Sequence, residues 1–165
     1  VYFKERFSIP ESLEEIKSTW MDMARDKYTN KVPLKPGARE FLVWLRQQGI
    51  RTGIASSNGI ELVETVLKAQ GIQEYLESVH TCCEVPKGKP APDIYLLVAE
   101  TLGVKPEECL VFEDVPMGIL AGKNAGMRVC AVEDTFSASQ REEKKELADY
   151  YIESYDEIPR ERMQP

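Results

Sequence analysis

Apolar residues recur along the chain with two different spacings, and the alternation between them predicts the secondary structure. A helical spacing predicts an amphipathic helix over residues 11–28, and Ser12 and Glu15 form a capping-box pattern at its start. The segment "NKVPLKPGA" then interrupts the pattern with two prolines and a glycine, which predicts a linker. The apolar stripe of the helix consists of Leu13, Ile16, Trp20 and Met23.

After the linker, short apolar strands alternate with helices of about ten residues. The predicted helices cover 37–48, 59–70, 92–102 and 116–125, and a further capped helix is expected to start with Ser137 and Gln140. The predicted strands cover 51–55, 78–81, 109–113, 128–132 and 149–152. Such alternation implies right-handed crossovers and a mostly parallel sheet covered by helices on both faces.

Polar side chains follow three of these strands, at the sheet edge where parallel sheets bind their ligands. They are Ser56, Ser57 and Asn58 after the first core strand, Lys89 in the loop after the second, and Glu113 and Asp114 at the end of the third. Each group alone has an ordinary interpretation as a helix cap, a loop lysine or a solvated acid pair. Two adjacent carboxylates nevertheless repel one another unless a cation offsets them, and Mg²⁺ prefers carboxylate oxygens. Hydroxyl, lysine and acid pair on one edge indicate a phosphoryl-transfer site.

The composition narrows the class of protein. The 165 residues are 42% hydrophobic and 30% charged, as in one soluble globular domain with a small appendage. A net charge of -7 argues against nucleic acid or an anionic membrane as partner, and no apolar run reaches membrane-spanning length. The four cysteines lack CxxC spacing and His80 is the single histidine, which disfavours a zinc site or a serine–histidine triad. Interpreted as reduced core residues, the cysteines predict a cytoplasmic protein.

Three segments, "IASSN", "GKPAPDIY" and "VFEDVPMGILAGKNAGM", resemble the second, third and fourth motifs of the haloacid dehalogenase superfamily. The likeness is greatest to its phosphatases and β-phosphoglucomutase-like members, and it covers roughly residues 34–153. It implies an α/β fold, with a Rossmann-like three-layer α/β/α core over 34–165. Residues 1–33 resemble the C-terminal part of the small helical cap that closes over the site in this family.

The resemblance also implies a role for each site residue. Ser56 would hydrogen-bond the transferring phosphoryl group, helped by the Ser57 amide and by Asn58. Lys89 would neutralise that group. Glu113 and Asp114 would hold Mg²⁺, with Asp114 favoured as the direct ligand. The predicted function is a Mg²⁺-dependent phosphatase acting on a small phosphorylated metabolite through an aspartyl-phosphate.

The family's first motif, DxDx(T/V), has no counterpart in the sequence, because no DxD tripeptide occurs anywhere in it. Its first aspartate becomes the aspartyl-phosphate, and its strand is the central one, between 51–55 and 109–113. Loss of that strand would leave backbone groups unpaired on both neighbours. We therefore expect the sequence to be the C-terminal portion of a longer protein, with the nucleophile in a missing N-terminal segment.

Other functions stay open on the sequence alone. The same motifs suit a sugar-phosphate mutase such as β-phosphoglucomutase. A catalytically dead module would keep the phosphate and metal contacts without the nucleophile. A signalling receiver domain also combines an acid pair, a hydroxyl and a lysine, but there the acid pair comes early and the lysine last, opposite to the order here.

Overall fold

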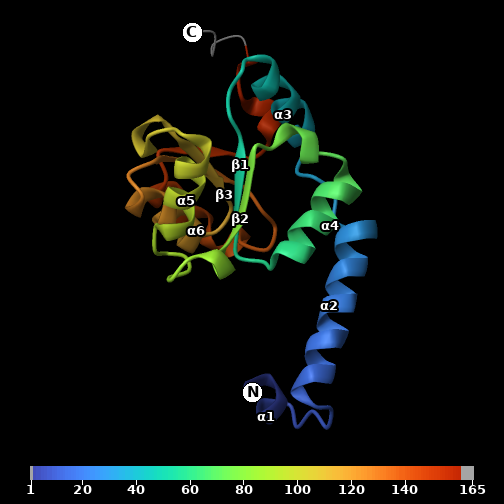
Figure 1. The fold of residues 1–165 in the computed structure, drawn as a ribbon. Helices are drawn as coiled ribbons and strands as arrows, with labels where there is room; N and C mark the ends of the chain where they lie inside the picture. The colour runs from blue at the N-terminus through green and yellow to red at the C-terminus, as the bar shows by residue number, and fades with distance from the viewer. Residues whose placement is uncertain (1, 161–165) are drawn as a thin grey trace.

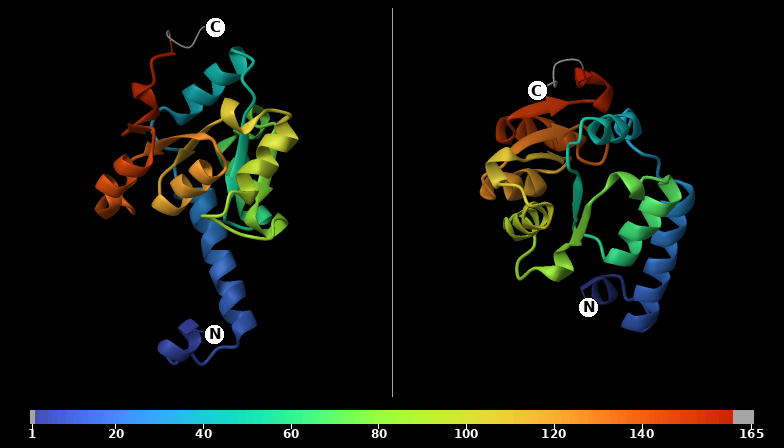
Figure 2. Two further views of the ribbon diagram at one scale, coloured as in Figure 1. Left: turned by 90° about the vertical axis from the view of Figure 1, so that its left-hand side faces the viewer. Right: turned by 45° about the horizontal axis from the view of Figure 1, so that its top comes forward.

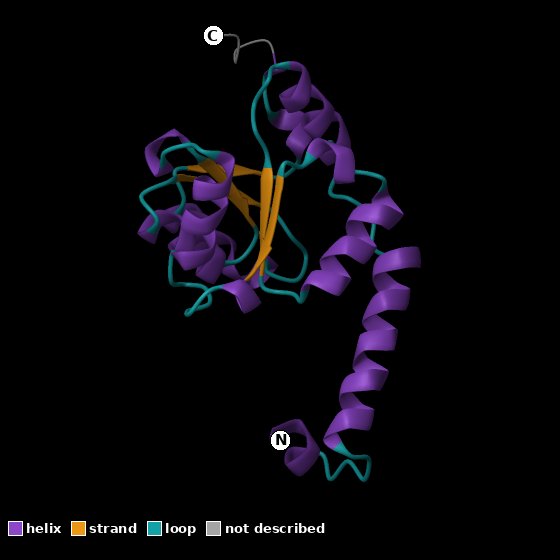
Figure 3. Cartoon of the chain, viewed as in Figure 1, coloured by secondary structure: helices purple, strands orange, loops and turns teal. Residues whose placement is uncertain are grey.

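The computed structural model describes residues 2–160 and has the predicted alternation of strands and helices (Figures 1 and 3). The helices are α1 (Tyr2–Arg6), α2 (Leu13–Asn30), α3 (Ala38–Gln47), α4 (Ile60–Gln70), α5 (Asp93–Leu102), α6 (Pro116–Asn124) and α7 (Arg141–Leu147). The strands are β1 (Gly53–Ser56), β2 (Ser78–Thr81), β3 (Leu110–Glu113), β4 (Arg128–Val132) and β5 (Tyr150–Ile152). The sequence pattern did not predict α1 or the short 3₁₀ turns, because single turns leave no periodic signal.

Local sequence chemistry explains where most helices begin and end. The predicted capping box of α2 is confirmed, since the Glu15 amide donates to Ser12 Oγ at 3.2 Å and the Ser12 amide donates to the Glu15 carboxylate at 2.8 Å. Helices α4 and α5 end at Gly71 and Gly103 in the left-handed conformation.

The prediction that Ser137 and Gln140 cap a helix is wrong. Residues Ala138–Gln140 form a 3₁₀ turn, α7 begins only at Arg141, and no side-chain hydrogen bond caps either element. The Ser137 hydroxyl instead donates to the backbone oxygen of Asp114, 2.5 Å away. The Ser137 hydroxyl therefore bonds to a residue that is distant in sequence instead of capping the neighbouring helix.

The core has three layers, as predicted (Figures 1 and 2). All strand pairs are parallel, in the orders β1–β2 and β3–β4–β5. Helices α5 and α6 pack on one face of the strands through a buried apolar cluster that includes Ile94, Ile119 and Val129. On the other face, Val63 and Leu67 of α4 pack against apolar side chains of β1 and β2. The fold is thus the Rossmann-like α/β/α core with a parallel sheet.

The sheet is divided in its middle. Within residues 2–160, β1 pairs only with β2 and β3 pairs only with β4, so that each has one edge without a strand neighbour. The strand that the sequence analysis expects between β1 and β3 stays a prediction.

The N-terminal helices extend away from the core (Figures 1 and 2). Helix α2 packs against α4, yet none of its residues is buried. Leu13, Trp20 and Met23 of the predicted apolar stripe are 40%, 55% and 60% exposed. Among the described helices, none has both the length and the apolar character needed to cross a membrane. The assignment of residues 1–33 to a cap stays a prediction.

Helix α6 approaches the strands closely at Gly122. A Cβ atom there would lie 2.7 Å from Val129 Cγ2 and 3.4 Å from Val111 Cβ.

We expect Gly122→Ala to lower the free energy of unfolding by about 1–3 kcal/mol, because the helix would have to move off the sheet. Urea denaturation of the intact protein would measure this. Gly88→Ala is the control, since a Cβ at Gly88 meets no atom within 4 Å; equal losses in both variants would contradict this packing.

Candidate active site

A cavity of about 300 Å³ opens at the carboxyl ends of β1 and β3, between the two sheets. The structure brings five of the six predicted site residues to its walls: Ser56, Ser57, Lys89, Glu113 and Asp114. It also adds residues that the sequence analysis missed, among them Lys35, Phe112 and Tyr155. Asn58 does not line the cavity.

Lys89 and Glu113 form an ion pair that links the two sheets. The Lys89 ammonium donates to the Glu113 carboxylate and to the backbone oxygen of Ala55 on β1, the latter at 3.1 Å. Both side chains are nearly buried, with 12% and 10% exposed. The Tyr95 hydroxyl also donates to Glu113, and burial together with that carboxylate raises the pKa of Tyr95. Glu113 is therefore engaged by Lys89 and Tyr95.

The start of α6 leaves room for this carboxylate. A Cβ atom at Gly118 would overlap with the Glu113 side chain. The sequence "EDVPMG" thus places a glycine in the first turn of α6, where the carboxylate needs the space. Any side chain at Gly118 would displace Glu113 from Lys89.

Asp114 has a different environment from Glu113. Its side chain is 39% exposed, and Oδ2 lies 3.5 Å from the Lys35 ammonium. Lys35 also donates to the Asp134 carboxylate and to the backbone oxygen of Glu133, the latter at 3.1 Å. The hydrogen bond from Lys35 lowers the pKa of Asp134. Asp134 follows the strand 128–132, so its position at a strand end could have indicated it; Lys35 lies in a linker and gives no such signal.

The three polar residues at the end of β1, Ser56, Ser57 and Asn58, contact different parts of the structure. We call them the serine segment. Ser56 Oγ accepts a hydrogen bond from the backbone amide of Asn58 at 3.1 Å, which forms a local turn. The Asn58 side chain turns to α2, where its amide donates to the Tyr28 hydroxyl at 3.2 Å. Ser57 Oγ lies 3.7 Å from Cys82 Sγ. Ser56 and Ser57 are the members of this segment at the cavity.

The residues present suit part of a Mg²⁺ site. Within residues 2–160, no group of three or more His, Cys, Asp or Glu side chains is arranged to hold a metal ion. Mg²⁺, however, is commonly held by one or two carboxylates, waters and substrate phosphate oxygens. Asp114 offers one exposed carboxylate at the cavity, whereas Glu113 is already paired with Lys89. Asp114 is therefore the residue of this chain that fits a direct ligand.

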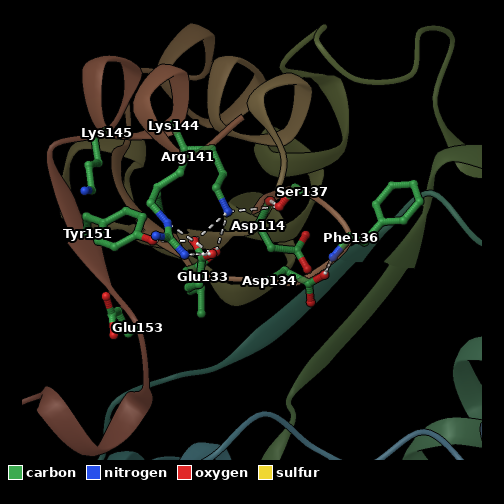
Figure 4. Close-up of polar contacts among 12 residues, drawn as sticks. Asp114, Glu133, Asp134, Phe136, Ser137, Arg141, Lys144, Lys145, Tyr151 and Glu153 are labelled. Atoms are coloured by element: carbon green, nitrogen blue, oxygen red, sulfur yellow. Dashed lines mark hydrogen bonds and ion pairs between the residues drawn. The ribbon is translucent and has the colours of Figure 1, made fainter. Parts of the chain in front are cut away.

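A second polar cluster lies behind Asp114 (Figure 4). At its centre, the Glu133 carboxylate accepts hydrogen bonds from the Arg141 guanidinium, with 2.6 Å to Nη2, and from the Tyr151 hydroxyl. The Lys144 ammonium lies 3.4 Å from the same carboxylate. The hydrogen bonds from Arg141 and Tyr151, with the charge of Lys144, lower the pKa of Glu133 to about 2.

Fold and cavity together define an α/β protein with a polar site at the carboxyl edge of its strands. The family model of the haloacid dehalogenase-like hydrolases matches residues 4–126. The chain belongs to this family.

Named relatives are similar over most of this chain. Hexitol phosphatase B of Escherichia coli (strain K12) is 32% identical over 126 residues, which make up 76% of this chain and 56% of that protein. Phosphorylated carbohydrates phosphatase of Thermotoga maritima is 32% identical over 123 residues, with 74% of this chain and 57% of that protein covered. The chain thus spans about half the length of the curated relatives it matches.

Solved structures agree with the fold. The crystal structure of CbbY from Rhodobacter sphaeroides in complex with xylulose-(1,5)-bisphosphate matches with a TM-score of 0.80 at 25% sequence identity. The match covers 90% of this chain and 67% of that chain.

The lowered pKa of Glu133 predicts a stabilisation that depends on pH. Its pKa falls from 4.5 to about 2 on folding, so the stabilisation is complete above about pH 4.5 and is lost as the pH falls toward 2. We expect Glu133→Gln to lower the melting temperature at pH 7 and to reduce its further decrease between pH 5 and 3. Thermal melts across this range would measure both effects.

Glu142→Gln serves as the control for this prediction, because the Glu142 side chain is 82% exposed. It should leave the pH dependence of the wild type unchanged. An unaltered decrease in the Glu133→Gln variant would show that the cluster does not hold Glu133 ionised.

Proposed function

We propose that the intact protein is a Mg²⁺-dependent phosphatase that acts on a small phosphorylated metabolite through an aspartyl-phosphate. The observation that carries the proposal is the convergence of Ser56, Lys89 and Asp114 on one cavity at the carboxyl ends of β1 and β3. A hydroxyl donor, an ammonium and an exposed carboxylate are the groups that a phosphoryl-transfer site needs for positioning and charge neutralisation. Membership of the hydrolase family supports the same reaction class.

The phosphoryl group is bound between Ser56 and Lys89. The Ser56 hydroxyl and the Ser57 amide donate to its oxygens, next to the N-terminus of α4, which favours an anion. Lys89 neutralises the charge of the phosphoryl group and of the nucleophile. Before substrate binds, the Lys89 ammonium is held in place by Glu113 and the Ala55 carbonyl. Lys89 is thereby preorganised, which lowers the cost of reorientation during the reaction.

The nucleophile is an aspartate of a segment outside these 165 residues, at the end of a strand that fits between β1 and β3. Two observations support this. Each of these strands has one edge without a strand neighbour within residues 2–160, and the chain contains no DxD tripeptide. A parallel strand in that position would pair both edges and would end at the cavity, beside Lys89 and Asp114.

Asp114 would hold a Mg²⁺ ion, which would supply positive charge to the phosphate oxygens. Lys35 lies 3.5 Å from the same carboxylate. Lys35 has a second acidic partner in Asp134, which would keep its charge compensated if Asp114 bound a metal ion.

The substrate class that we favour is a small phosphorylated carbohydrate or polyol. The names of the two phosphatases described above support it. Residues 1–33 act as part of a cap. The hydrogen bond from Asn58 to Tyr28 of α2 connects the serine segment to that cap.

Phosphate release tests the proposal. The intact protein should release inorganic phosphate from p-nitrophenyl phosphate and from sugar phosphates in the presence of Mg²⁺. Asp114→Asn should nearly abolish turnover because it removes a charged metal ligand, and Glu113→Gln should have a smaller effect. Asp22→Asn, an exposed change on α2, is the matched control and should behave as wild type.

Two results would contradict this function. Unchanged Mg²⁺ dependence in Asp114→Asn would remove the metal assignment. Formation of glucose 6-phosphate from β-glucose 1-phosphate without net phosphate release would identify a mutase instead.

Ser56 and Ser57 should respond differently to truncation. Ser56→Ala removes a hydrogen bond to a charged group, which we expect to cost about 1–3 kcal/mol of transition-state stabilisation. Ser57→Ala should have a smaller effect, because the expected donor at that residue is the backbone amide. Steady-state kcat/KM values for both variants provide the measurement. A larger loss for Ser57→Ala would mean that Ser57, not Ser56, supplies the hydroxyl.

A further inference from the structure

Lys144 on α7 is a charged side chain that is fully buried, with 0% exposed. Burial of an ammonium is unfavourable unless every donor has a partner. Here the ammonium lies 2.9 Å from Ser137 Oγ, 3.3 Å from the backbone oxygen of Val132 and 3.4 Å from the Glu133 carboxylate (Figure 4). Three donors therefore have three acceptors, and one of these acceptors is a hydroxyl.

The direction of the hydrogen bonds through that hydroxyl follows from donor chemistry. An ammonium can only donate, so Ser137 Oγ must be the acceptor toward Lys144. The Ser137 proton is then free to point elsewhere, and the backbone oxygen of Asp114 lies 2.5 Å from Oγ. Ser137 is 1% exposed, so water does not compete for this proton. The chain of donors runs from Lys144 through Ser137 to Asp114.

The charges around Lys144 are balanced without involving the Asp114 side chain. Glu133 faces Lys144 and is itself held by Arg141 and Tyr151. The neighbouring Lys145 lies at the surface with the ring of Tyr151 and with Glu142. Removal of the Lys144 charge would thus leave Glu133 with two donors, and the main loss would fall on Ser137.

Asp114 lies at a point of the backbone that regular structure does not hold. Strand β3 ends at Glu113 and helix α6 begins at Pro116, so the Asp114 peptide belongs to neither element. The direction of its side chain depends on that peptide. A buried hydrogen bond to its carbonyl oxygen limits rotation there, and the ammonium behind Ser137 keeps the hydroxyl proton aimed at it.

We propose that Lys144 and Ser137 are positioning residues that hold the Asp114 peptide and so aim its carboxylate at the metal ion. This inference rests on the proposed function, since it concerns the same site. It differs from a purely structural role for Lys144, which would join α7 to β4 without affecting the properties of Asp114.

The test measures metal binding in the intact protein without substrate. Mn²⁺ serves as the probe, and electron paramagnetic resonance reports the free ion during titration. We expect Lys144→Met and Ser137→Ala each to weaken Mn²⁺ binding by about 10- to 100-fold, the usual range for partners that orient a metal ligand. The Mg²⁺ concentration needed for half-maximal phosphatase rate should rise by a similar factor.

Two control variants separate positioning from stability. Lys145→Met makes the same chemical change one residue along α7, at an exposed side chain, and should leave Mn²⁺ affinity unchanged. Val129→Ala truncates a fully buried side chain of β4 and should lower the melting temperature without a change in Mn²⁺ affinity. The first control shows the effect of losing a lysine charge, and the second shows the effect of losing buried packing.

Wild-type Mn²⁺ affinity in Ser137→Ala would overturn the inference, even if Lys144→Met failed to fold. Lowered melting temperatures with wild-type affinity in both variants would make the cluster structural only. A wild-type protein that binds no Mn²⁺ and releases no phosphate would instead overturn the proposed function, and this inference with it.

Discussion

The ion pair between Lys89 and Glu113 is the interaction on which the arrangement of this site depends. Within the described residues the two sheets share no strand pairing, and Lys89 contacts both the Ala55 carbonyl of β1 and the carboxylate at the end of β3. Because both side chains are nearly buried, loss of either partner would leave a charge without compensation. The pair thus holds the cavity walls together and keeps an ammonium ready at the centre of the site.

Other charged side chains near the cavity are also paired with neighbours of opposite charge. Lys35 lies between Asp114 and Asp134, and Lys144 lies against Glu133. Asp114 and Asp134 share Lys35, whereas Glu113 is paired with Lys89, so the acid pair at the end of β3 does not carry two uncompensated charges. Glu113 and Asp114 are adjacent in sequence yet belong to separate pairs, with different exposure and different partners.

The two carboxylates therefore have different environments. Glu113 is enclosed by Lys89, Tyr95 and the space at Gly118, which suits a residue that orients a lysine. Asp114 is more exposed and is backed by the buried hydroxyl of Ser137, which suits a residue that meets a metal ion and substrate. The two environments differ because Glu113 is the last residue of β3, whereas Asp114 lies between β3 and α6.

The sequence by itself determined the alternation of strands and helices, the parallel sheet and the edge where Ser56, Lys89 and Asp114 would meet. These follow from periodicity, from glycine and proline positions, and from the rule that parallel strands end at a common edge. Only the tertiary structure decided which charge pairs with which. The positions of Lys35 and Lys144, and the use of Ser137 as a donor to Asp114 rather than as a helix cap, depend on contacts between residues 7 to 99 positions apart, which leave no trace in local spacing.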